Sequence, residues 1–355
     1  MKLKLALIVL VSIVLCNTTL SQSGRIRTKD KNSQQDDKGA VRLRAEEVLL
    51  PVSVRTDTGK LIEKLLPSDL IVAEDDKRQQ ITSVLRMNSN VLLILDTSGR
   101  EVIVKSINKN RELALKIIES LGSQDQAAIL TYADKVSLIS DWKTDKEELR
   151  QSLNEKFKPG LDARLYESLL FAARQVLPKA DGRRSVVLIT DGVNSFDAQA
   201  FSDALAELHR ARATVYIVSQ GQIILDDIEP RAYNALSWYE MLTSERSRIL
   251  RLRRYAGKIT EGQALLGKLA EDTGGFVWIP KSDEEFLKAN AEVIEEIGTE
   301  FVVSYITERR KGDEDFHSVK VYPATASMRV RSRSRVYPNK SQEKSSKNTL
   351  PASKN

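Results

Sequence analysis

The chain has 355 residues, of which 41% are hydrophobic and 29% are charged. This balance is typical of a globular protein and excludes a wholly disordered chain. The formal net charge of +6 is a small excess for this length, so we expect no nucleic-acid partner. A single cysteine excludes an intramolecular disulfide, and the length predicts two domains or one domain with additions.

Residues 1–21 have the pattern of a secretory signal peptide. Two lysines precede an apolar run at 5–16, and the small residues Thr19 and Ser21 suit the positions before a cleavage site. The run is too short to span a bilayer. We therefore expect an exported protein, periplasmic or extracellular after cleavage; a lipid anchor on Cys16 and a retained membrane anchor are the alternatives.

Strands are expected on both sides of a central region. Residues 22–40 are polar and predict a disordered leader. Residues 41–88 contain β-type runs at 48–54, 69–76 and 80–87. Three short strands rarely form a stable sandwich alone, so we expect them to pair with strands at 301–306, 318–322 and 328–337. The segments 41–88 and 301–338 would form one small β-domain, and 339–355 a disordered tail.

Residues 89–300 alternate between strands and helices, which predicts a doubly wound, mostly parallel α/β sheet. The runs at 91–95 and 186–190 are almost wholly apolar, as expected of strands that are buried on both faces. Other strands are expected at 126–132, 136–139, 214–219 and 276–279. Helices are expected at 104–121, 145–157, 165–177, 198–211, 265–272 and 284–297.

Polar side chains follow the two apolar strands at the point where each strand ends. The first strand runs into Asp96 and Ser98, and the second runs into Asp191. Ligands bind beyond the carboxyl ends of parallel strands, where the strand order reverses. If the two strands are neighbours there, the two carboxylates and the hydroxyl converge, and this set of donors suits a hard cation such as Mg²⁺.

This pattern resembles the metal-ion-dependent adhesion site of the von Willebrand factor A family, an Asp-x-Ser-x-Ser turn with a Thr and an Asp on later loops. Asp96, Ser98 and Asp191 match it. The resemblance covers 89–300, and the flanking strands look like those of an exported bacterial subgroup. It implies a non-enzymatic protein-binding or adhesion-type module. It also implies a bound Mg²⁺, Mn²⁺ or Ca²⁺, whose coordination is completed by an acidic side chain of a protein partner.

Two positions depart from the family pattern. Arg100 stands where the second Ser is expected, and Ala163 stands where the Thr is expected; Asp162 is a candidate substitute ligand. Three interpretations stay open. The site binds a metal, or it is degenerate and the Arg100 guanidinium bridges Asp96 and Asp191, or the carboxylates only cap turns. In the degenerate site no metal is needed, and Arg100 would itself receive the acidic group of the partner.

Two groups of basic residues predict other contacts. Residues 221–262 are longer than an α/β connection needs, and we interpret them as a helical insertion. It is either a helix pair with a solvated face or a surface for a partner or an anionic envelope. The residues of that surface are Trp238, Tyr239, Arg251, Arg253 and Arg254. Four arginines alternate along the strand predicted at 328–337, which places them on one face that we expect to be solvated. They are Arg329, Arg331, Arg333 and Arg335.

No motif in the sequence predicts an enzyme. There is no Gly-x-Ser-x-Gly elbow, and neither His209 nor His317 lies in a recognisable nucleophile context. We expect His209 at the surface or at the boundary of its helix. A structural envelope scaffold, which binds partners through 221–262 or the β-domain without metal, is the second functional class. A hydrolase is the third, and the missing nucleophile–base pair argues against it.

Overall fold

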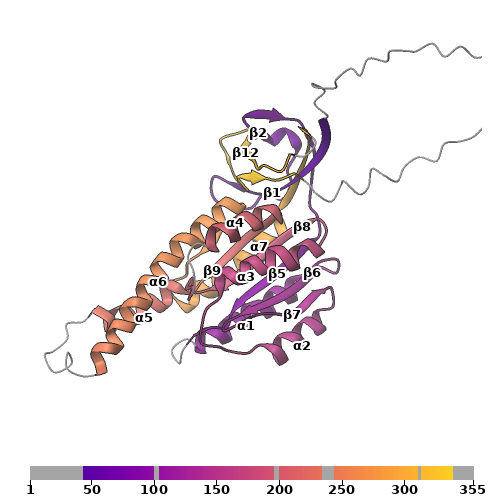
Figure 1. Cartoon of the computed structure of the whole chain (residues 1–355). Helices are drawn as coiled ribbons and strands as arrows, with labels where there is room; N and C mark the ends of the chain where they lie inside the picture. Colours follow the sequence, from indigo (N-terminus) through magenta and orange to yellow (C-terminus); the bar gives the residue numbers. More distant parts are fainter. Residues whose placement is uncertain (1–42, 100–103, 196–199, 234–243, 311–312, 339–355) are drawn as a thin grey trace, which may run out of the picture. The chain divides into compact units, whose positions relative to one another are not determined.

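The computed structural model describes residues 43–99, 104–195, 200–233, 244–310 and 313–338 (Figure 1). The predicted signal peptide, leader and tail lie outside these ranges, as do Arg100, Trp238 and Tyr239. Within the described ranges, no helix combines the length and the apolar character that crossing a membrane requires.

A six-stranded sheet forms the centre of the fold, in the order β10-β9-β8-β5-β6-β7. Its strands are β5 (Ser89–Asp96), β6 (Gln126–Tyr132), β7 (Val136–Lys143), β8 (Arg183–Thr190), β9 (Ala213–Ser219) and β10 (Val277–Trp278). All neighbours are parallel except β6 and β7. The predicted doubly wound, mostly parallel sheet is therefore confirmed. The strand order reverses at β5, because β6 follows it on one side and β8 lies on the other.

Helices cover both faces of this sheet. They are α1 (Val104–Ser120), α2 (Lys146–Lys156), α3 (Leu165–Phe171), α4 (Ala200–Arg210), α5 (Gly221–Tyr233), α6 (Ser244–Thr273) and α7 (Asp283–Thr299). Successive side chains of β5 point to opposite faces. Leu92 and Ile94 share a core with α3, α4 and α6, whereas Leu93 and Leu95 share a second core with α1, α2 and α7. Cover on both faces explains why β5 is apolar along its length.

Two four-stranded sheets combine strands from before and after the central region, in the orders β13-β1-β11-β4 and β14-β12-β2-β3. Their strands are β1 (Leu43–Thr56), β2 (Leu70–Glu74), β3 (Lys77–Gln79), β4 (Ile81–Leu85), β11 (Phe301–Arg310), β12 (His317–Pro323), β13 (Met328–Ser332) and β14 (Arg335–Val336). β1 pairs with β11, and β2 pairs with β12. The expected pairing between the two flanks is therefore present, and Leu50, Val72 and Val303 lie in their common core.

A buried carboxylate connects α7 to the first flanking sheet. The Glu296 side chain is fully buried and accepts hydrogen bonds from Ser53, Arg55 and Arg331. Removal of one partner from a buried ion pair leaves the other charge uncompensated and typically costs about 3–5 kcal/mol. These contacts therefore fix α7, the last helix of the central region, against β1 and β13.

The expectation of four arginines on one solvated face is wrong. β13 ends at Ser332, and β14 belongs to the other flanking sheet, so the alternation does not continue along one strand. Arg331 binds the buried Glu296. Arg333 is 1% exposed and donates a hydrogen bond from Nη2 to the main-chain oxygen of Arg212 (2.6 Å). Two of the four arginines thus make contacts inside the fold.

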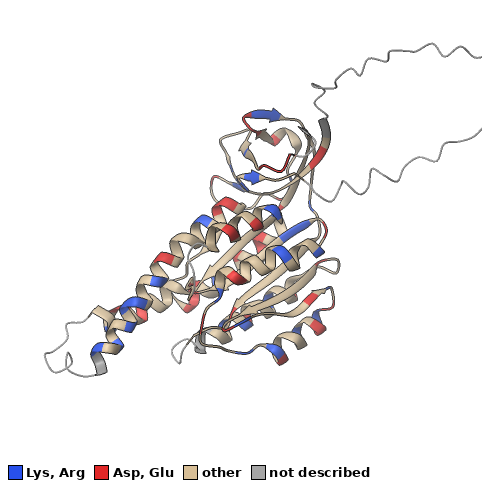
Figure 2. Ribbon diagram, in the orientation of Figure 1, with Lys and Arg blue, Asp and Glu red and all other residues tan. Residues whose placement is uncertain are grey.

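In the connection that we predicted as helical, the described residues belong to α5 and α6. The two helices pack together through a small core that contains Ile224, Ile228 and Ile259. The helix that we expected at 265–272 is the last part of a longer helix, since α6 is continuous from Ser244 to Thr273. Figure 2 shows basic residues along α6. The exposed ones include the three named from the sequence, Arg251, Arg253 and Arg254.

His209 is buried, whereas we expected it at the surface or a boundary. It lies on α4 and is 1% exposed, and neither ring nitrogen has a hydrogen-bond partner among the described residues. Burial, with the nearby charges of Arg333 and Arg335, lowers the pKa of its imidazole to about 3. The folded protein therefore keeps His209 neutral at pH values where the unfolded chain protonates it.

We expect the free energy of unfolding to fall as the pH is lowered from about 6.5, the ordinary histidine pKa, towards 3. In this range only the unfolded state binds a proton at His209. The loss between pH 7 and pH 5 is about 2 kcal/mol, and His209→Leu should remove it. Urea unfolding of both proteins at the two pH values measures the difference. An identical pH dependence in the variant and the wild type would contradict this assignment.

Candidate functional site

Two neighbouring strands bring carboxylates to the same edge of the central sheet. β5 ends at Asp96, and Asp191 directly follows β8. These strands are parallel, with Leu95 opposite Ile189, so the two aspartates lie at adjoining strand ends where the strand order reverses. Both are nearly buried, with 5% of Asp96 and 7% of Asp191 exposed. The convergence that we expected at this edge is therefore present.

Hydrogen bonds hold the Asp96 carboxylate in one orientation. Its Oδ1 accepts from the main-chain N (2.8 Å) and the Oγ (2.5 Å) of Ser98. Its Oδ2 accepts from the hydroxyls of Tyr132 (2.9 Å) and Thr190 (3.3 Å). The side-chain amide of Asn110, on α1, donates to the main-chain oxygen of Asp96 (2.9 Å). Three adjacent strands and α1 together fix the position of this carboxylate.

A helix distant in sequence holds Asp191. Its Oδ1 accepts from the main-chain N of Val193 (2.8 Å), and its Oδ2 accepts from the hydroxyl of Tyr255 on α6 (2.5 Å). Close approach requires glycine on both sides of this contact. Gly192 has a φ of +86°, and a Cβ on Gly262 of α6 would lie 2.0 Å from the Gly192 oxygen. α6 therefore packs directly onto the loop that carries Asp191.

Burial raises the pKa of both carboxyl groups. Burial, with the charge of Asp191 as the second cause, raises the pKa of Asp96 to about 7, although hydrogen bonds from Ser98 and Tyr132 act in the opposite direction. Burial also raises the pKa of Asp191, against the hydrogen bond from Tyr255. Two buried carboxylates are stable in their ionised form only beside a positive charge. This edge of the sheet therefore favours the binding of a proton or a cation.

A third loop reaches the same edge of the sheet. The Gly99 amide donates to the Gly160 oxygen (3.0 Å), and the Gly160 amide donates to the Thr97 oxygen (2.9 Å). The Ala163 amide donates to Ser195 Oγ (2.9 Å), and the Ser195 amide donates to the Ala163 oxygen (2.8 Å). The loop in which the family has a Thr is therefore in place, but Ala163 contributes a buried methyl group instead of a hydroxyl.

Two further residues named from the sequence stay hypotheses. Asp162 is exposed, and its main-chain amide donates to Asp134 Oδ1 (2.8 Å). This bond positions the loop and does not test Asp162 as a substitute ligand. Arg100 lies outside the described residues, so the interpretation in which it bridges the carboxylates is also a prediction.

Sequence reasoning missed three hydroxyl groups that hold the carboxylates: those of Tyr132, Thr190 and Tyr255. Thr190 directly precedes Asp191, and Tyr132 pairs with Asp96 across β5 and β6. A register argument between neighbouring strands could therefore have identified both. No comparable signal surrounds Tyr255, which lies within a long helix and reaches Asp191 only because α6 packs against its loop.

The donors at this edge are hard oxygen atoms, namely the carboxylates of Asp96 and Asp191 and the hydroxyl of Ser98. Such donors suit Mg²⁺, Mn²⁺ or Ca²⁺, of which Mg²⁺ commonly keeps several water ligands as well. The mutual repulsion of the two buried carboxylates is a second reason why a divalent cation fits here.

Residues 91–194 match the family model of the von Willebrand factor type A domain. Comparison with curated proteins gives no match. Among solved structures, the chain is similar to a von Willebrand factor type A protein from Catenulispora acidiphila, with 10% identity over 87% of this chain and 76% of that one (TM-score 0.43). It is also similar to BatB from Bacteroides thetaiotaomicron, with 18% identity over 37% and 66% of the two chains (TM-score 0.31).

A third similar structure is proximal thread matrix protein 1 from the mussel byssus, with zinc in its own metal-ion-dependent adhesion site. Its identity to this chain is 13%, over 63% of this chain and 48% of that one (TM-score 0.43). The chain thus spans 66% of the BatB structure and about half of the mussel structure.

The family match includes β5, β6, β7 and β8 and the loops that carry Asp96, Ser98 and Asp191. The observed strand order and the convergence of the two carboxylates agree with what that family implies. Residues 91–194 are therefore the part of the chain that is similar to the von Willebrand factor type A domain.

Proposed function

We propose that the chain is an exported, non-enzymatic module that binds a protein partner at the edge formed by Asp96, Ser98 and Asp191. The observation that supports this most strongly is the pair of buried carboxylates at adjoining strand ends. A divalent cation compensates their charges, and an acidic side chain of the partner completes its coordination. The apolar segment at 5–16 supports export to the periplasm or the outside.

The residues around the cation have separate tasks. Asp96 and Ser98 provide oxygen donors from one loop, and Asp191 provides them from the next. When bound, the cation offers a coordination position to a carboxylate from outside. Tyr132 and Thr190 orient Asp96 with neutral hydroxyls, so they fix its direction without cancelling the charge that attracts the cation.

Tyr255 competes with the cation for Asp191. Burial and the Asp191 charge raise the pKa of the Tyr255 hydroxyl, so it stays protonated and donates to Asp191 Oδ2. A cation that binds this oxygen has to displace the hydroxyl. The affinity of the site therefore depends on how strongly α6 holds Tyr255 in place.

A second candidate function rests on the exposed basic residues of α6. Arg251 and Arg254 are exposed, and an anionic envelope surface or an acidic protein would bind them without a metal. In that function the chain is a structural scaffold. A hydrolase is the least supported function, because the sequence offers no recognisable nucleophile motif and His209 has no hydrogen-bond partner within the described ranges.

We expect isothermal titration calorimetry to show that the full chain binds Mg²⁺ and that Asp191→Ala abolishes binding, because one of two carboxylate donors is lost. Asp181→Ala, which removes an exposed carboxylate near the other end of β8, is the matched control and should bind like the wild type. Absence of binding in the wild type would contradict the metal-dependent function. Recovery of binding in Arg100→Ser would then assign the loss to the Arg100 guanidinium.

Tyr255→Phe should bind Mg²⁺ about tenfold more tightly than the wild type. The variant lacks the hydrogen bond from Tyr255 to Asp191 that the cation has to displace, and a hydrogen bond to a charged group contributes about 1.5–3 kcal/mol. The same titration measures it. Tyr233→Phe is the control, since Tyr233 is exposed at the end of α5. Equal or weaker binding by Tyr255→Phe would show that Tyr255 and the cation do not compete.

Co-purification from an envelope extract separates the two candidate functions. A partner that binds through the cation should be retained in Mg²⁺ and lost with a chelator or in Asp96→Ala. A partner that binds through α6 should survive both changes and be lost in the double variant Arg251→Ala/Arg254→Ala and at high ionic strength, which screens exposed charges. Retention that follows the second pattern would contradict the metal-dependent function.

A further inference from the structure

A histidine and two carboxylates meet in the second flanking sheet. β2 ends at Glu74 and is followed by Asp75, and β12 begins at His317. The two strands are antiparallel, with Val319 opposite Glu74, and the Asp75 amide donates to the Ser318 oxygen (2.9 Å). This pairing brings the turn after β2 next to the first residue of β12.

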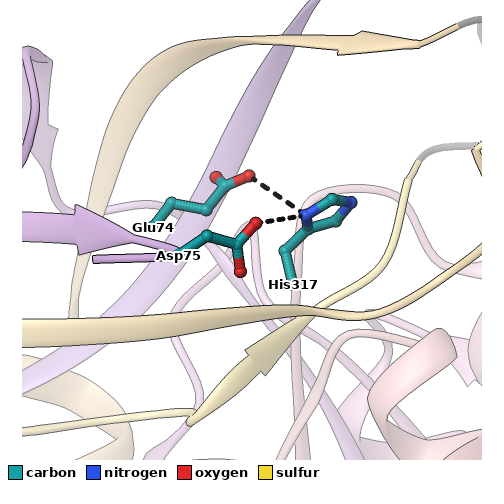
Figure 3. Close-up of side chains that lie close together, drawn as sticks. All are labelled: Glu74, Asp75 and His317. Carbon is teal, nitrogen blue, oxygen red and sulfur yellow. Dashed lines mark hydrogen bonds and ion pairs between the residues drawn. The ribbon is translucent and has the colours of Figure 1, made fainter. Parts of the chain in front are cut away.

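One ring nitrogen of His317 faces both carboxylates (Figure 3). Its Nδ1 lies 2.7 Å from Asp75 Oδ2 and 4.0 Å from Glu74 Oε1, and the three atoms lie within 4.8 Å of one another. Donors bound to one zinc ion are about 3–4 Å apart. The Asp75 side chain is 50% exposed, so it can turn from its hydrogen bond with Nδ1 towards an ion, and it leaves a path for that ion from solvent.

Outer partners orient the two less exposed ligands. Asp313 Oδ2 lies 3.1 Å from His317 Nε2, and a histidine that binds a metal usually donates its other N–H to a carboxylate. A proton on Nε2 leaves the Nδ1 lone pair directed at Glu74 and Asp75. Glu74 is 4% exposed, and its Oε2 accepts from the Tyr305 hydroxyl (2.6 Å). His317 and Glu74 are therefore each oriented by a hydrogen bond to the atom that faces away from the proposed ion.

Without a metal, Nδ1 of His317 lies at hydrogen-bond distance from Asp75 and Nε2 from Asp313. Binding of a metal replaces the hydrogen bond between Nδ1 and Asp75 by a bond between Nδ1 and the metal. A bond from Nδ1 to the metal forms, the Nδ1–H bond breaks, and the proton passes to solvent. A divalent ion brings two positive charges to this group of carboxylates, whereas the proton brings one.

We propose that Glu74, Asp75 and His317 bind a divalent transition metal, Zn²⁺ or an ion of similar chemistry, with water in the open position. Imidazole combined with carboxylates suits Zn²⁺, whereas Mg²⁺ and Ca²⁺ prefer oxygen ligands alone. Because β2 precedes the central sheet in sequence and β12 follows it, the ion links the two flanks of the chain. This site is separate from Asp96 and Asp191 and does not depend on the function proposed for them.

Co²⁺ is the spectroscopic probe for this site and Zn²⁺ the thermodynamic one, both used on the full chain in excess Mg²⁺. We expect visible Co²⁺ absorption typical of a nitrogen–oxygen site of low coordination number, and displacement of Co²⁺ by Zn²⁺. His317→Gln and Asp75→Asn should weaken Zn²⁺ binding by more than about 100-fold, and Asp313→Asn by about 10–100-fold, as loss of an outer partner usually does.

Asp76→Asn is the matched control for Asp75→Asn. The two residues are adjacent and both have a positive φ, +47° and +61°, a conformation that Asn adopts readily. The Asp76 carboxylate binds Lys320 (2.8 Å) instead of the histidine, so Asp76→Asn should keep full affinity. Thermal unfolding of each variant in chelator verifies folding, and Zn²⁺ should raise the melting temperature only of proteins that retain the site.

The outcomes decide between the two arrangements of His317. Zn²⁺ affinity that is lost in Asp75→Asn but unchanged in Asp76→Asn and in Asp191→Ala would support a metal centre independent of the von Willebrand factor type A site. Two results would overturn it: no Zn²⁺ binding by the wild type, or equal affinity in Asp75→Asn and Asp76→Asn. Either would leave His317 as a hydrogen-bond partner of Asp75 and Asp313 without a metal.

Discussion

The structure is organised around two carboxylates, Asp96 and Asp191, that lie buried at the ends of adjoining parallel strands. Pairing between β5 and β8 fixes their positions, so their repulsion cannot be relieved by moving the strands apart. Hydroxyl groups of Ser98, Tyr132 and Tyr255 satisfy the carboxylate oxygens but bring no charge. The compensating species is therefore a proton or a cation. The edge binds this ion, and the hydrogen bond between Tyr255 and Asp191 changes when a cation binds.

The opposite ends of the same strands carry charges that are already compensated. β8 begins at Arg183, whose Nη1 lies 3.0 Å from Glu300 Oε2, next to the first residue of β11. Glu300 also accepts from the hydroxyl of Tyr216 on β9 (2.8 Å). The amino ends of the central strands are thus tied to the flanking sheet, whereas α6 covers the carboxyl edge through the Tyr255–Asp191 hydrogen bond and the close approach of Gly262 to Gly192.

The sequence predicted those parts of the fold that depend on local patterns. A strand buried on both faces stays apolar until it ends, so the runs of β5 and β8 identified the sheet and placed Asp96 and Asp191 at its edge. Contacts between distant elements were not predictable in this way. Tyr255 reaches Asp191 across 64 positions. Arg333 is buried, and its guanidinium donates a hydrogen bond to the main-chain oxygen of Arg212 in the turn between α4 and β9. His209 lies four residues after Leu205 and eight after Phe201, on the buried face of α4, so helical spacing indicated burial although its side chain is polar.

The most direct test of the cation site is an anomalous-scattering map from crystals of the full chain grown with Mn²⁺. We expect an anomalous peak between Asp96, Ser98 and Asp191, with the Tyr255 hydroxyl displaced from Asp191. A map without a peak at this edge, and with Tyr255 still hydrogen-bonded to Asp191, would contradict it.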